Sequence, residues 1–336
     1  MMKNPRNKRI LLAVLGALVL FFLVINILPP AKVAENNPFR IEEGELPMIA
    51  AHRGGSINNP ENTMLAFREA VYTVGVDILE SDLYLTKDGH LVYNHDAYID
   101  RTCNVNGDLS AEEVRELCRE ESNRHYIRDM TLEELQQYNF GYYFTDKEGN
   151  RPYRDAEDPA AMGLQIATVE QLFAEFYESH PDLLFIVEIK NGGEMGIEAC
   201  RILNEVLQSY PGYADQIVIG TFHPEVEEEL AQTYPHLMHG AATSSAAAFY
   251  VTHLLGVNLF YNADFECLQI PMSYDVGVEL PMDLPLLIRR AQRRNIAVQY
   301  WTVSNAEDMR RLIEMGCDCI MTDDPALMKQ VLEEYQ

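Results

Sequence analysis

The chain has few of the features that would narrow its function at once. Its 336 residues include six cysteines and no Cys-x-x-Cys pair, so the ligand spacing typical of a structural zinc site is missing. No Gly-x-Gly-x-x-Gly follows the first apolar strand pattern, and neither a P-loop nor a Gly-x-Ser-x-Gly motif is present. These absences weaken zinc-finger, nucleotide-binding and serine-hydrolase interpretations.

Basic residues are also scarce. The chain has 26 Lys and Arg against 52 Asp and Glu, which gives a formal net charge of −26. Because nucleic-acid binding requires basic patches, we expect no nucleic-acid partner. The same charge repels an anionic substrate at long range, so a phosphate-bearing substrate would need local positive charge in its site.

The cysteines are scattered along the chain. Cys103 and Cys118 either form a disulfide in an oxidising compartment or, like the other four, are buried thiols. The sequence leaves both alternatives open.

One run is long enough and apolar enough to cross a membrane, and only Gly16 and Asn26 interrupt it. Residues 10–28 would span roughly 28 Å as a helix, close to the hydrocarbon thickness of a bilayer. Four basic residues precede the run: Lys3, Arg6, Lys8 and Arg9. By the positive-inside rule, residues 1–9 stay in the cytoplasm and the rest lies outside, which predicts a single-pass cell-membrane protein with an extracytoplasmic catalytic domain.

The alternative for this run is a cleaved signal peptide. The apolar core of a signal peptide is usually shorter, about 7–15 residues, and is followed by a small-x-small cleavage site. Lys32 and Ala34 make a poor site of that kind, so we favour the uncleaved anchor. Pro29 and Pro30 end the helix, and residues 29–46 are predicted to be a tether.

From residue 47 to residue 336, apolar strand patterns alternate with helical patterns. The eight predicted strands are Met48–His52, Asp77–Leu83, Leu184–Lys190, Gln216–Phe222, Leu237–Ala242, Cys267–Pro271, Ala297–Val303 and Cys319–Thr322. Predicted helices include Thr63–Thr73, Val169–Ser179, Pro285–Arg294 and Ala306–Met315. This alternation predicts an α/β fold, a TIM (β/α)8 barrel, with a doubly wound open sheet as the second choice.

Two segments interrupt the alternation. Residues 85–92 contain a tight Asp88-Gly89 turn that can join only antiparallel strands, and folding back there would bring His95 roughly opposite Asp82. Residues 97–167 form an inserted segment that we expect above the barrel mouth. Two helices are predicted within it, Ala111–Cys118 and Leu132–Tyr138.

Three carboxylates stand at the ends of predicted strands. Glu80 and Asp82 are two residues apart, so on a strand their side chains face the same way, and Glu188 ends another strand. Solvated strand-end carboxylates are the simple alternative. Taken together, the three predict a metal site, and an all-oxygen ligand set suits Ca²⁺ or Mg²⁺.

Two histidines and two cations accompany these carboxylates. His52 and His95 each neighbour a charged residue, and such a pair can exchange acid and base roles near neutral pH. Arg53 and Lys190 could hold a phosphate or could pair with the carboxylates. Trp301, the only tryptophan, could stack on a substrate or pack in the core.

These residues resemble the glycerophosphodiester phosphodiesterase family. The resemblance is carried by His52-Arg53-Gly54, Pro60-Glu61-Asn62-Thr63, Glu80-x-Asp82, Thr86-Lys87-Asp88-Gly89, His95-Asp96, Asp100-Arg101-Thr102, Glu188-Ile189-Lys190, Trp301-Thr302-Val303 and Thr322-Asp323-x-Pro325. It spans nearly all of residues 48–336.

The resemblance implies a phosphoric diester hydrolase with a barrel fold. It implies one divalent cation on Glu80, Asp82 and Glu188, with Glu61 as a supporting residue near the metal. It implies His52 and His95 as acid and base, and Arg53 and Lys190 on the substrate phosphate. The products would be sn-glycerol 3-phosphate and an alcohol.

Two other functions fit the same residues less well. One is a phospholipase C-like or sphingomyelinase D-like phosphodiesterase that acts on membrane lipid, for which the anchor and the 97–167 insertion would be useful. The other is a catalytically inactive, membrane-anchored binding protein, against which the full set of histidines and carboxylates argues.

Overall fold

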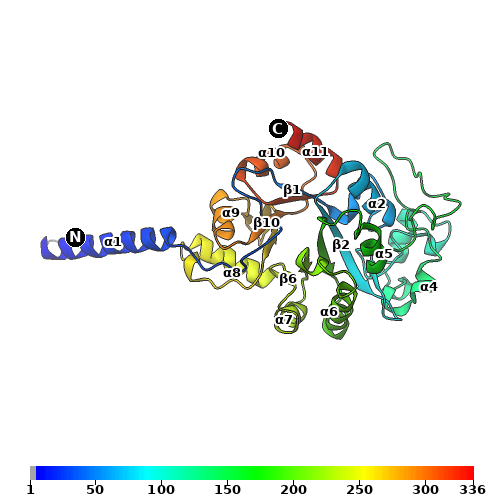
Figure 1. Cartoon of the computed structure of the whole chain (residues 1–336), viewed down its shortest axis with the longest axis horizontal. Helices are drawn as coiled ribbons and strands as arrows, with labels where there is room; N and C mark the ends of the chain where they lie inside the picture. Colours follow the sequence, from blue (N-terminus) through cyan, green and yellow to red (C-terminus); the bar gives the residue numbers. More distant parts are fainter. Residues whose placement is uncertain (1–4) are drawn as a thin grey trace.

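Eight parallel strands form the centre of the protein in a computed structural model, which describes residues 5–336 (Figure 1). The strands are β1 (Met48–Ala51), β2 (Ile78–Leu85), β4 (Leu184–Ile189), β5 (Ile217–Gly220), β6 (Met238–His239), β7 (Cys267–Ile270), β10 (Ala297–Tyr300) and β11 (Cys319–Thr322). Each pairs with its neighbour in chain order, and β11 returns to β1 with Met48 opposite Cys319. A parallel bridge between Gly240 and Cys267 closes the ring.

The closed ring confirms the predicted (β/α)8 barrel, and the open sheet is wrong. All eight predicted strands are present, although most end earlier than expected. Their inner faces supply a small core of aliphatic and sulfur-containing side chains, such as Ile78, Ile186 and Val218. Their outer faces pack against the helices, and that layer holds the larger apolar core.

Helices cover the outside of the barrel. They are α2 (Met64–Arg68), α5 (Val169–Phe176), α6 (Gly193–Leu207), α7 (Pro224–Thr233), α8 (Thr243–Leu254), α9 (Pro285–Gln292), α10 (Ala306–Met315) and α11 (Pro325–Glu333). Side chains of Thr63, Thr168 and Asn305 accept N–H groups at three helix starts. The predicted helix from Thr63 is α2 followed by a π-helical stretch, Glu69–Val74.

The hairpin and the inserted segment lie beside β2. Strand β3 (Leu91–Tyr93) pairs antiparallel with β2, and the backbone N–H of Asn94 donates to the carbonyl of Asp82. The predicted fold-back is therefore confirmed to within one residue. The insertion contains α3 (Ala111–Leu117) and α4 (Leu132–Leu135), and α4 is shorter than predicted.

The insertion has a small apolar core of its own. Its buried side chains are Val92, Ile99, Cys103, Ile127, Leu135, Phe140 and Ile166. Cys103 and Cys118 are both buried free thiols. A second excursion, the exposed hairpin β8 (Ser273–Asp275) and β9 (Glu279–Pro281), joins β7 to α9.

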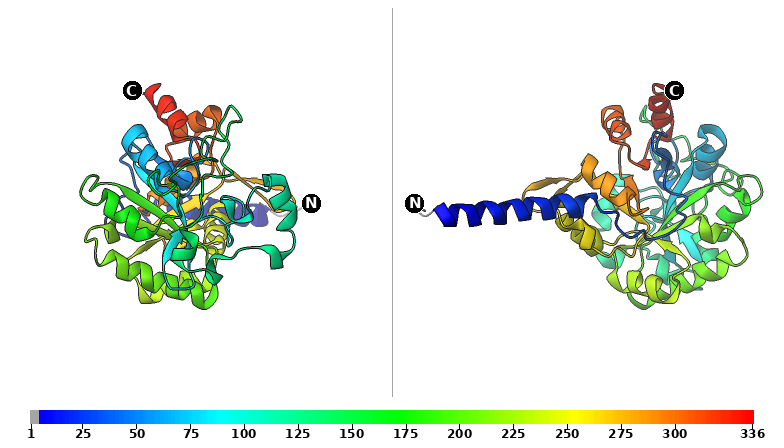
Figure 2. Two further views of the ribbon diagram at one scale, coloured as in Figure 1. Left: turned by 90° about the vertical axis from the view of Figure 1, so that its right-hand side faces the viewer. Right: turned by 60° about the vertical axis from the view of Figure 1, so that its left-hand side comes forward.

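The N-terminal helix α1 (Pro5–Ile27) projects from the barrel (Figures 1 and 2). Among the described residues, Lys8–Ile27 is the one helix long and apolar enough to cross a membrane. Lys3, counted among the basic residues before the apolar run, lies outside the described residues.

The stretch between α1 and β1, expected as a tether, contacts the amino-terminal end of the barrel. Phe39 is fully buried against the inner core. The side-chain amide of Asn37 donates to the carbonyls of Glu266 and Asn295, both at 2.9 Å. Arg40 pairs with the buried Asp318. Burial of Phe39 and these polar contacts hold the segment on the barrel.

Candidate active site

The site is a pocket of about 290 Å³ at the carboxyl ends of the barrel strands, where barrel enzymes bind their substrates. Its polar lining comes from six of the barrel strands or the residues just after them, and from the residue His95 after the hairpin. The charged and histidine residues that line it are His52, Arg53, Glu80, Asp82, His95, Glu188 and Lys190. Eight of the nine site residues predicted from the sequence thus line one pocket, Trp301 included. The ninth, Glu61, lies beside it.

The turn after β1 places the first two of these side chains. Arg53 has a φ of 52°, the left-handed region that few residues other than glycine adopt, and such strain is common at functional sites. A Cβ on Gly54 would lie 2.8 Å from the Cβ of Ala66, and one on Gly55 would lie 2.9 Å from Pro325. The two glycines therefore let the turn pack tightly under α2 and α11.

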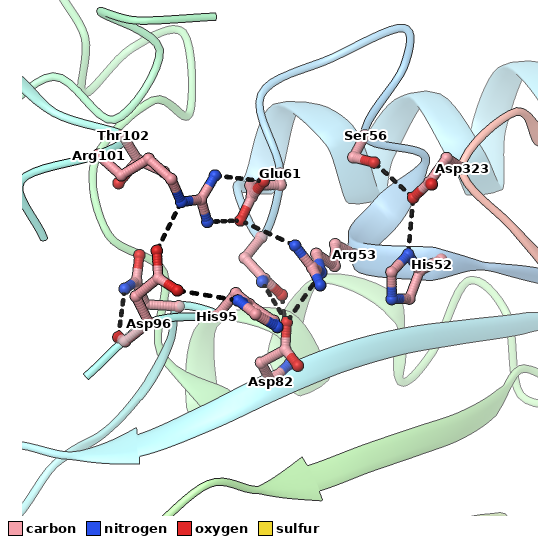
Figure 3. Close-up of polar contacts among 12 residues, drawn as sticks. His52, Arg53, Ser56, Glu61, Asp82, His95, Asp96, Arg101, Thr102 and Asp323 are labelled. Atoms are coloured by element: carbon pink, nitrogen blue, oxygen red, sulfur yellow. Dashed lines mark hydrogen bonds and ion pairs between the residues drawn. The ribbon is translucent and has the colours of Figure 1, made fainter. Parts of the chain in front are cut away.

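Each histidine is held through Nδ1 by an aspartate (Figure 3). His52 Nδ1 lies 2.6 Å from Asp323 Oδ1, and His95 Nδ1 lies 3.0 Å from Asp96 Oδ1. Burial alone would raise the pKa of both aspartates, but the histidine hydrogen bonds and neighbouring cations outweigh it and keep both pKa values low. Ionised carboxylates only accept hydrogen bonds, so Nδ1 donates in each pair.

The free Nε2 of each ring is thereby left for chemistry in the pocket. His52 Nε2 is 3.9 Å from Glu80 Oε2. Burial alone would lower the pKa of His52, but attraction to Glu80 and the hydrogen bond to Asp323 raise it above its usual value. A histidine with an oriented ring and a free Nε2 is suited to proton transfer.

The three carboxylates lie on adjacent strands. Asp82 on β2 is paired in register with Glu188 on β4, and Lys190 Nζ lies between them, 3.0 Å from Asp82 and 2.8 Å from Glu188. Burial, opposed by His52 and reinforced by repulsion from Asp82 and Glu188, raises the pKa of Glu80 to about 7. Burial also raises the pKa of Glu188.

No group of three or more His, Cys, Asp or Glu side chains among residues 5–336 is spaced to hold a metal ion. Lys190 occupies the space between two of the predicted ligands. The donor chemistry nevertheless fits a hard cation, because three carboxylates share one pocket and Glu80 is buried within it.

Arg53 and Glu61 take part in a chain of ion pairs. Arg53 Nε is 3.3 Å from Asp82 Oδ2, and its Nη1 is 3.4 Å from Glu61 Oε1. Arg101 makes two further bonds to Glu61, at 3.0 and 2.6 Å, and one to Asp96 at 2.5 Å. Glu61 therefore joins the two cations on the side of the site away from His52 (Figure 3).

Trp301 packs in the core, and because it also lines the pocket its contact with substrate stays a prediction. In the pocket its ring lies edge-on to Phe222 with centroids 6.4 Å apart. The two rings form an apolar wall opposite the charged residues.

Comparison with known proteins identifies the family. Residues 52–327 match the model of the glycerophosphoryl diester phosphodiesterase family. The chain belongs to this family.

Relatives and solved structures agree. A glycerophosphodiester phosphodiesterase of Caldanaerobacter subterraneus is 29% identical over 282 residues, covering 83% of this chain and 94% of the relative. A glycerophosphoryl diester phosphodiesterase structure from Silicibacter pomeroyi superposes with a TM-score of 0.65 at 18% identity, over 89% of this chain and 96% of that one. An Oleispira antarctica phosphodiesterase in complex with sn-glycerol-3-phosphate has a TM-score of 0.60 at 19% identity, over 86% and 97%.

The sequence analysis assigned no role to three residues that the structure places in the site of this phosphodiesterase. Asp323 holds His52, Arg101 joins Glu61 to Asp96, and the amide of Asn62 donates to Asp82 Oδ2 at 2.9 Å. All three belong to motifs that carried the family resemblance. Their positions after strand ends or in motif loops were the signal that could have marked them as site residues. Their hydrogen-bond partners lie on other segments, so the local sequence could not predict those contacts.

Proposed function

We propose that this chain hydrolyses glycerophosphodiesters to sn-glycerol 3-phosphate and an alcohol. The observation that carries the proposal is the matched pair of histidines, each fixed through Nδ1 by an ionised aspartate and both lining one pocket. Cleavage of a phosphodiester requires one proton to be removed and another to be delivered. Two oriented histidines meet that requirement. The sn-glycerol-3-phosphate in the Oleispira antarctica structure supports the product assignment.

His52 and His95 divide the two proton transfers in this proposal. One takes a proton from the attacking hydroxyl, which belongs to water or to the neighbouring glycerol carbon. In the second case the new P–O bond closes a cyclic phosphate as the alcohol leaves, and water then opens that ring to sn-glycerol 3-phosphate while the two histidines exchange roles. The other gives a proton to the leaving alkoxide at its free Nε2. The aspartates Asp96 and Asp323 stabilise the imidazolium form of each ring when it carries the extra proton.

Arg53 and Lys190 hold the phosphate. Both cations line the pocket, and both pair with Asp82. Their guanidinium and ammonium groups provide the local positive charge that the acidic chain otherwise lacks. Glu61 positions the Arg53 side chain through its ion pair. Trp301 contacts the less polar part of the substrate.

Glu80, Asp82 and Glu188 are the proposed ligands of one divalent cation, Ca²⁺ or Mg²⁺. Their oxygens suit such an ion, and three carboxylates share the pocket with only two cationic side chains, Arg53 and Lys190. When bound, the ion would polarise the phosphoryl oxygens. Lys190 must move from between Asp82 and Glu188, which frees its ammonium group for the phosphate.

The helix α1 is the proposed anchor, with the N-terminus in the cytoplasm and the barrel outside. Its length, its apolar composition and the basic residues before it support this topology. Protease added to intact cells should remove the barrel. A protected barrel, or complete release into the medium after processing, would contradict the topology.

A substrate panel tests the proposed reaction. Purified full-length protein with added Ca²⁺ or Mg²⁺ would be assayed against glycerophosphocholine, glycerophosphoethanolamine, glycerophosphoglycerol and intact phospholipid vesicles. We expect release of sn-glycerol 3-phosphate from at least one of the first three. Turnover of vesicles alone would favour the lipid phosphodiesterase. No turnover of any substrate, with either metal, would favour the inactive binding protein.

A further inference from the structure

The exposed large apolar side chains of the barrel are concentrated in one region. Outside α1, most of those in the described chain lie between Val251 and Leu286. We call six of them the membrane-side patch: Leu254, Leu255, Phe260, Val276, Val278 and Leu286. Val276 and Val278 are 62% and 68% exposed, although soluble surfaces rarely gather such residues in one place without a partner.

The patch adjoins the end of α1. The ring of Phe260 stacks on Phe21 with centroids 6.4 Å apart. The side-chain amide of Asn26 donates to the carbonyl of Gly256 at 3.1 Å. Arg293 donates to the carbonyls of Ile27 and Leu28 at 2.9 and 2.7 Å. The last two turns of α1 are therefore fastened to the loop after α8 and to the end of α9.

No slack separates α1 from the barrel, because residues after Pro30 also contact it. The backbone N–H of Val33 donates to the carbonyl of Arg294, and the amide of Asn295 donates to the carbonyl of Ala34, both at 2.9 Å. A membrane that holds α1 must therefore lie next to the face of the barrel that carries the patch.

The β8–β9 hairpin projects from the barrel toward the same side as α1 in the right-hand view of Figure 2, where it is orange-yellow. Its acidic side chains make bonds within the hairpin. Asp275 Oδ1 accepts the N–H of Gly277 at 2.7 Å, and Glu279 Oε1 accepts the hydroxyl of Ser273 at 2.8 Å. Val276 and Val278 flank Gly277 in the turn, and both side chains are exposed.

The basic side chains on this side lie beside α1 and suit phospholipid phosphates. Helix α9 carries Arg289 and Arg290 and is followed by Arg293, in a chain whose net charge is −26. Arginine beside exposed aliphatic and aromatic groups is the combination that binds lipid phosphates and the upper acyl chains together.

We propose that the membrane-side patch lies in the headgroup region of the phospholipid bilayer that α1 crosses. The proposal rests on α1 being the anchor proposed above. The barrel is then held at a fixed orientation on the membrane by two attachments, α1 and the patch. The hairpin belongs to the connection after β7, at the same end of the barrel as the pocket, so this orientation places one edge of the pocket rim toward the lipid.

Fluorescence quenching in nanodiscs tests the proposal with the full-length chain. Single cysteines would be introduced as Val278→Cys and Leu255→Cys and labelled with an environment-sensitive fluorophore. The six native cysteines are buried, so the exposed thiol reacts selectively. Matched controls are Ile197→Cys on α6 and Tyr335→Cys near the C-terminus, two exposed sites away from α1 (Figure 1). Leu15→Cys reports on α1 itself.

The quencher is doxyl-labelled phosphatidylcholine in a phosphatidylcholine–phosphatidylglycerol bilayer. We expect it to lower emission from the Val278 and Leu255 labels at least about twofold, as for groups that lie some 5–10 Å into the interface, and to leave the controls unchanged. A circular-dichroism spectrum and a Tm equal to those of the unlabelled wild type show that each labelled variant is folded.

The other outcomes separate the possible failures. Quenching at Leu15 alone would keep the anchor and overturn the patch proposal. No quenching at Leu15 would overturn both the anchor and the patch, while leaving the catalytic proposal to its own assay. Blue-shifted emission at Val278 without lipid quenching would show that protein, not lipid, covers the patch, which also overturns the proposal. Equal quenching at the control site Ile197 would also overturn the proposal, because the quenching would then not be specific to the patch.

Discussion

His52 Nδ1 and Asp323 Oδ1 lie 2.6 Å apart across the junction of the first and last barrel strands. The bond joins residues 271 positions apart in the chain. Asp323 also accepts the hydroxyl of Ser56 at 2.6 Å, which fixes the carboxylate itself. The barrel must therefore close before this half of the acid–base pair exists.

Asp323→Asn should change the pH dependence of catalysis. Attraction to Glu80 and the bond to Asp323 together raise the pKa of His52, so removal of the aspartate charge lowers it. The limb of the kcat profile that belongs to His52 should move to lower pH. The loss in kcat should be at least about tenfold, part of the 10²–10⁴-fold that a proton transfer supplies. Asp96→Asn should leave that limb in place, and an unmoved limb in Asp323→Asn would rule out the coupling.

His52→Ala and His95→Ala should each lower kcat by at least about a hundredfold, the lower end of what general acid or base catalysis contributes. The wild-type pH–rate profile should be bell-shaped, and each variant should lose one limb. His236→Ala, an exposed histidine that contacts Asn204, is the matched control and should keep normal kcat. Near-normal kcat in either variant would reassign that histidine to a structural role.

Chelation should abolish turnover. Metal-stripped protein in excess EDTA should be inactive, and added Ca²⁺ or Mg²⁺ should restore it, because the pocket has more carboxylates than its cations neutralise. Glu188→Gln should require more metal for half-maximal activity, since it removes one charged ligand. Titration calorimetry should show the same weakening. Full turnover by the stripped protein would refute the role of the cation.

Phe39→Ala should destabilise the protein by about 3–5 kcal/mol, the usual cost of removing a buried aromatic side chain. Phe39 has no exposed surface and packs against Ala50 and Ile78 at the amino-terminal end of the barrel. Urea unfolding of the detergent-solubilised chain measures the change. Tyr335→Ala, at a partly exposed site, should change stability by less than about 0.5 kcal/mol. Equal stability of the two variants would show that the segment before β1 adds little.

Asp100 should contribute stability that is lost in acid. Burial would raise its pKa, but hydrogen bonds from the His125 ring and backbone and from Asn106 outweigh it and lower the pKa. A folded pKa below the unfolded value of about 3.9 stabilises the native state above that pH, and the effect disappears as pH falls through the folded value.

The Tm of Asp100→Asn should therefore lie below that of the wild type at pH 7, and the gap should narrow as pH falls below about 4. Asp155→Asn, at an exposed aspartate, should show no such gap. A gap that stays constant with pH would mean that the charge of Asp100 is not the cause.

The sequence by itself determined the barrel and most of the pocket. Apolar residues recur with a different period in strands than in helices, so the alternation of the two elements can be predicted. The same pattern places polar residues such as Glu80 and Glu188 at strand ends. In a parallel barrel all those ends meet on one side, so local pattern was enough to gather the site. The Asp88-Gly89 turn likewise determined the hairpin, because so short a turn can only reverse the chain.

Only the tertiary structure decided how these groups are paired. Strand pattern cannot show that Asp323 reaches His52, that Lys190 lies between Asp82 and Glu188, or that Arg101 joins Glu61 to Asp96. Nor could the polar composition of residues 29–46 show that Phe39 enters the barrel. Each of these contacts joins segments that lie far apart in the chain or on different elements, so it depends on barrel closure and register rather than on local preference.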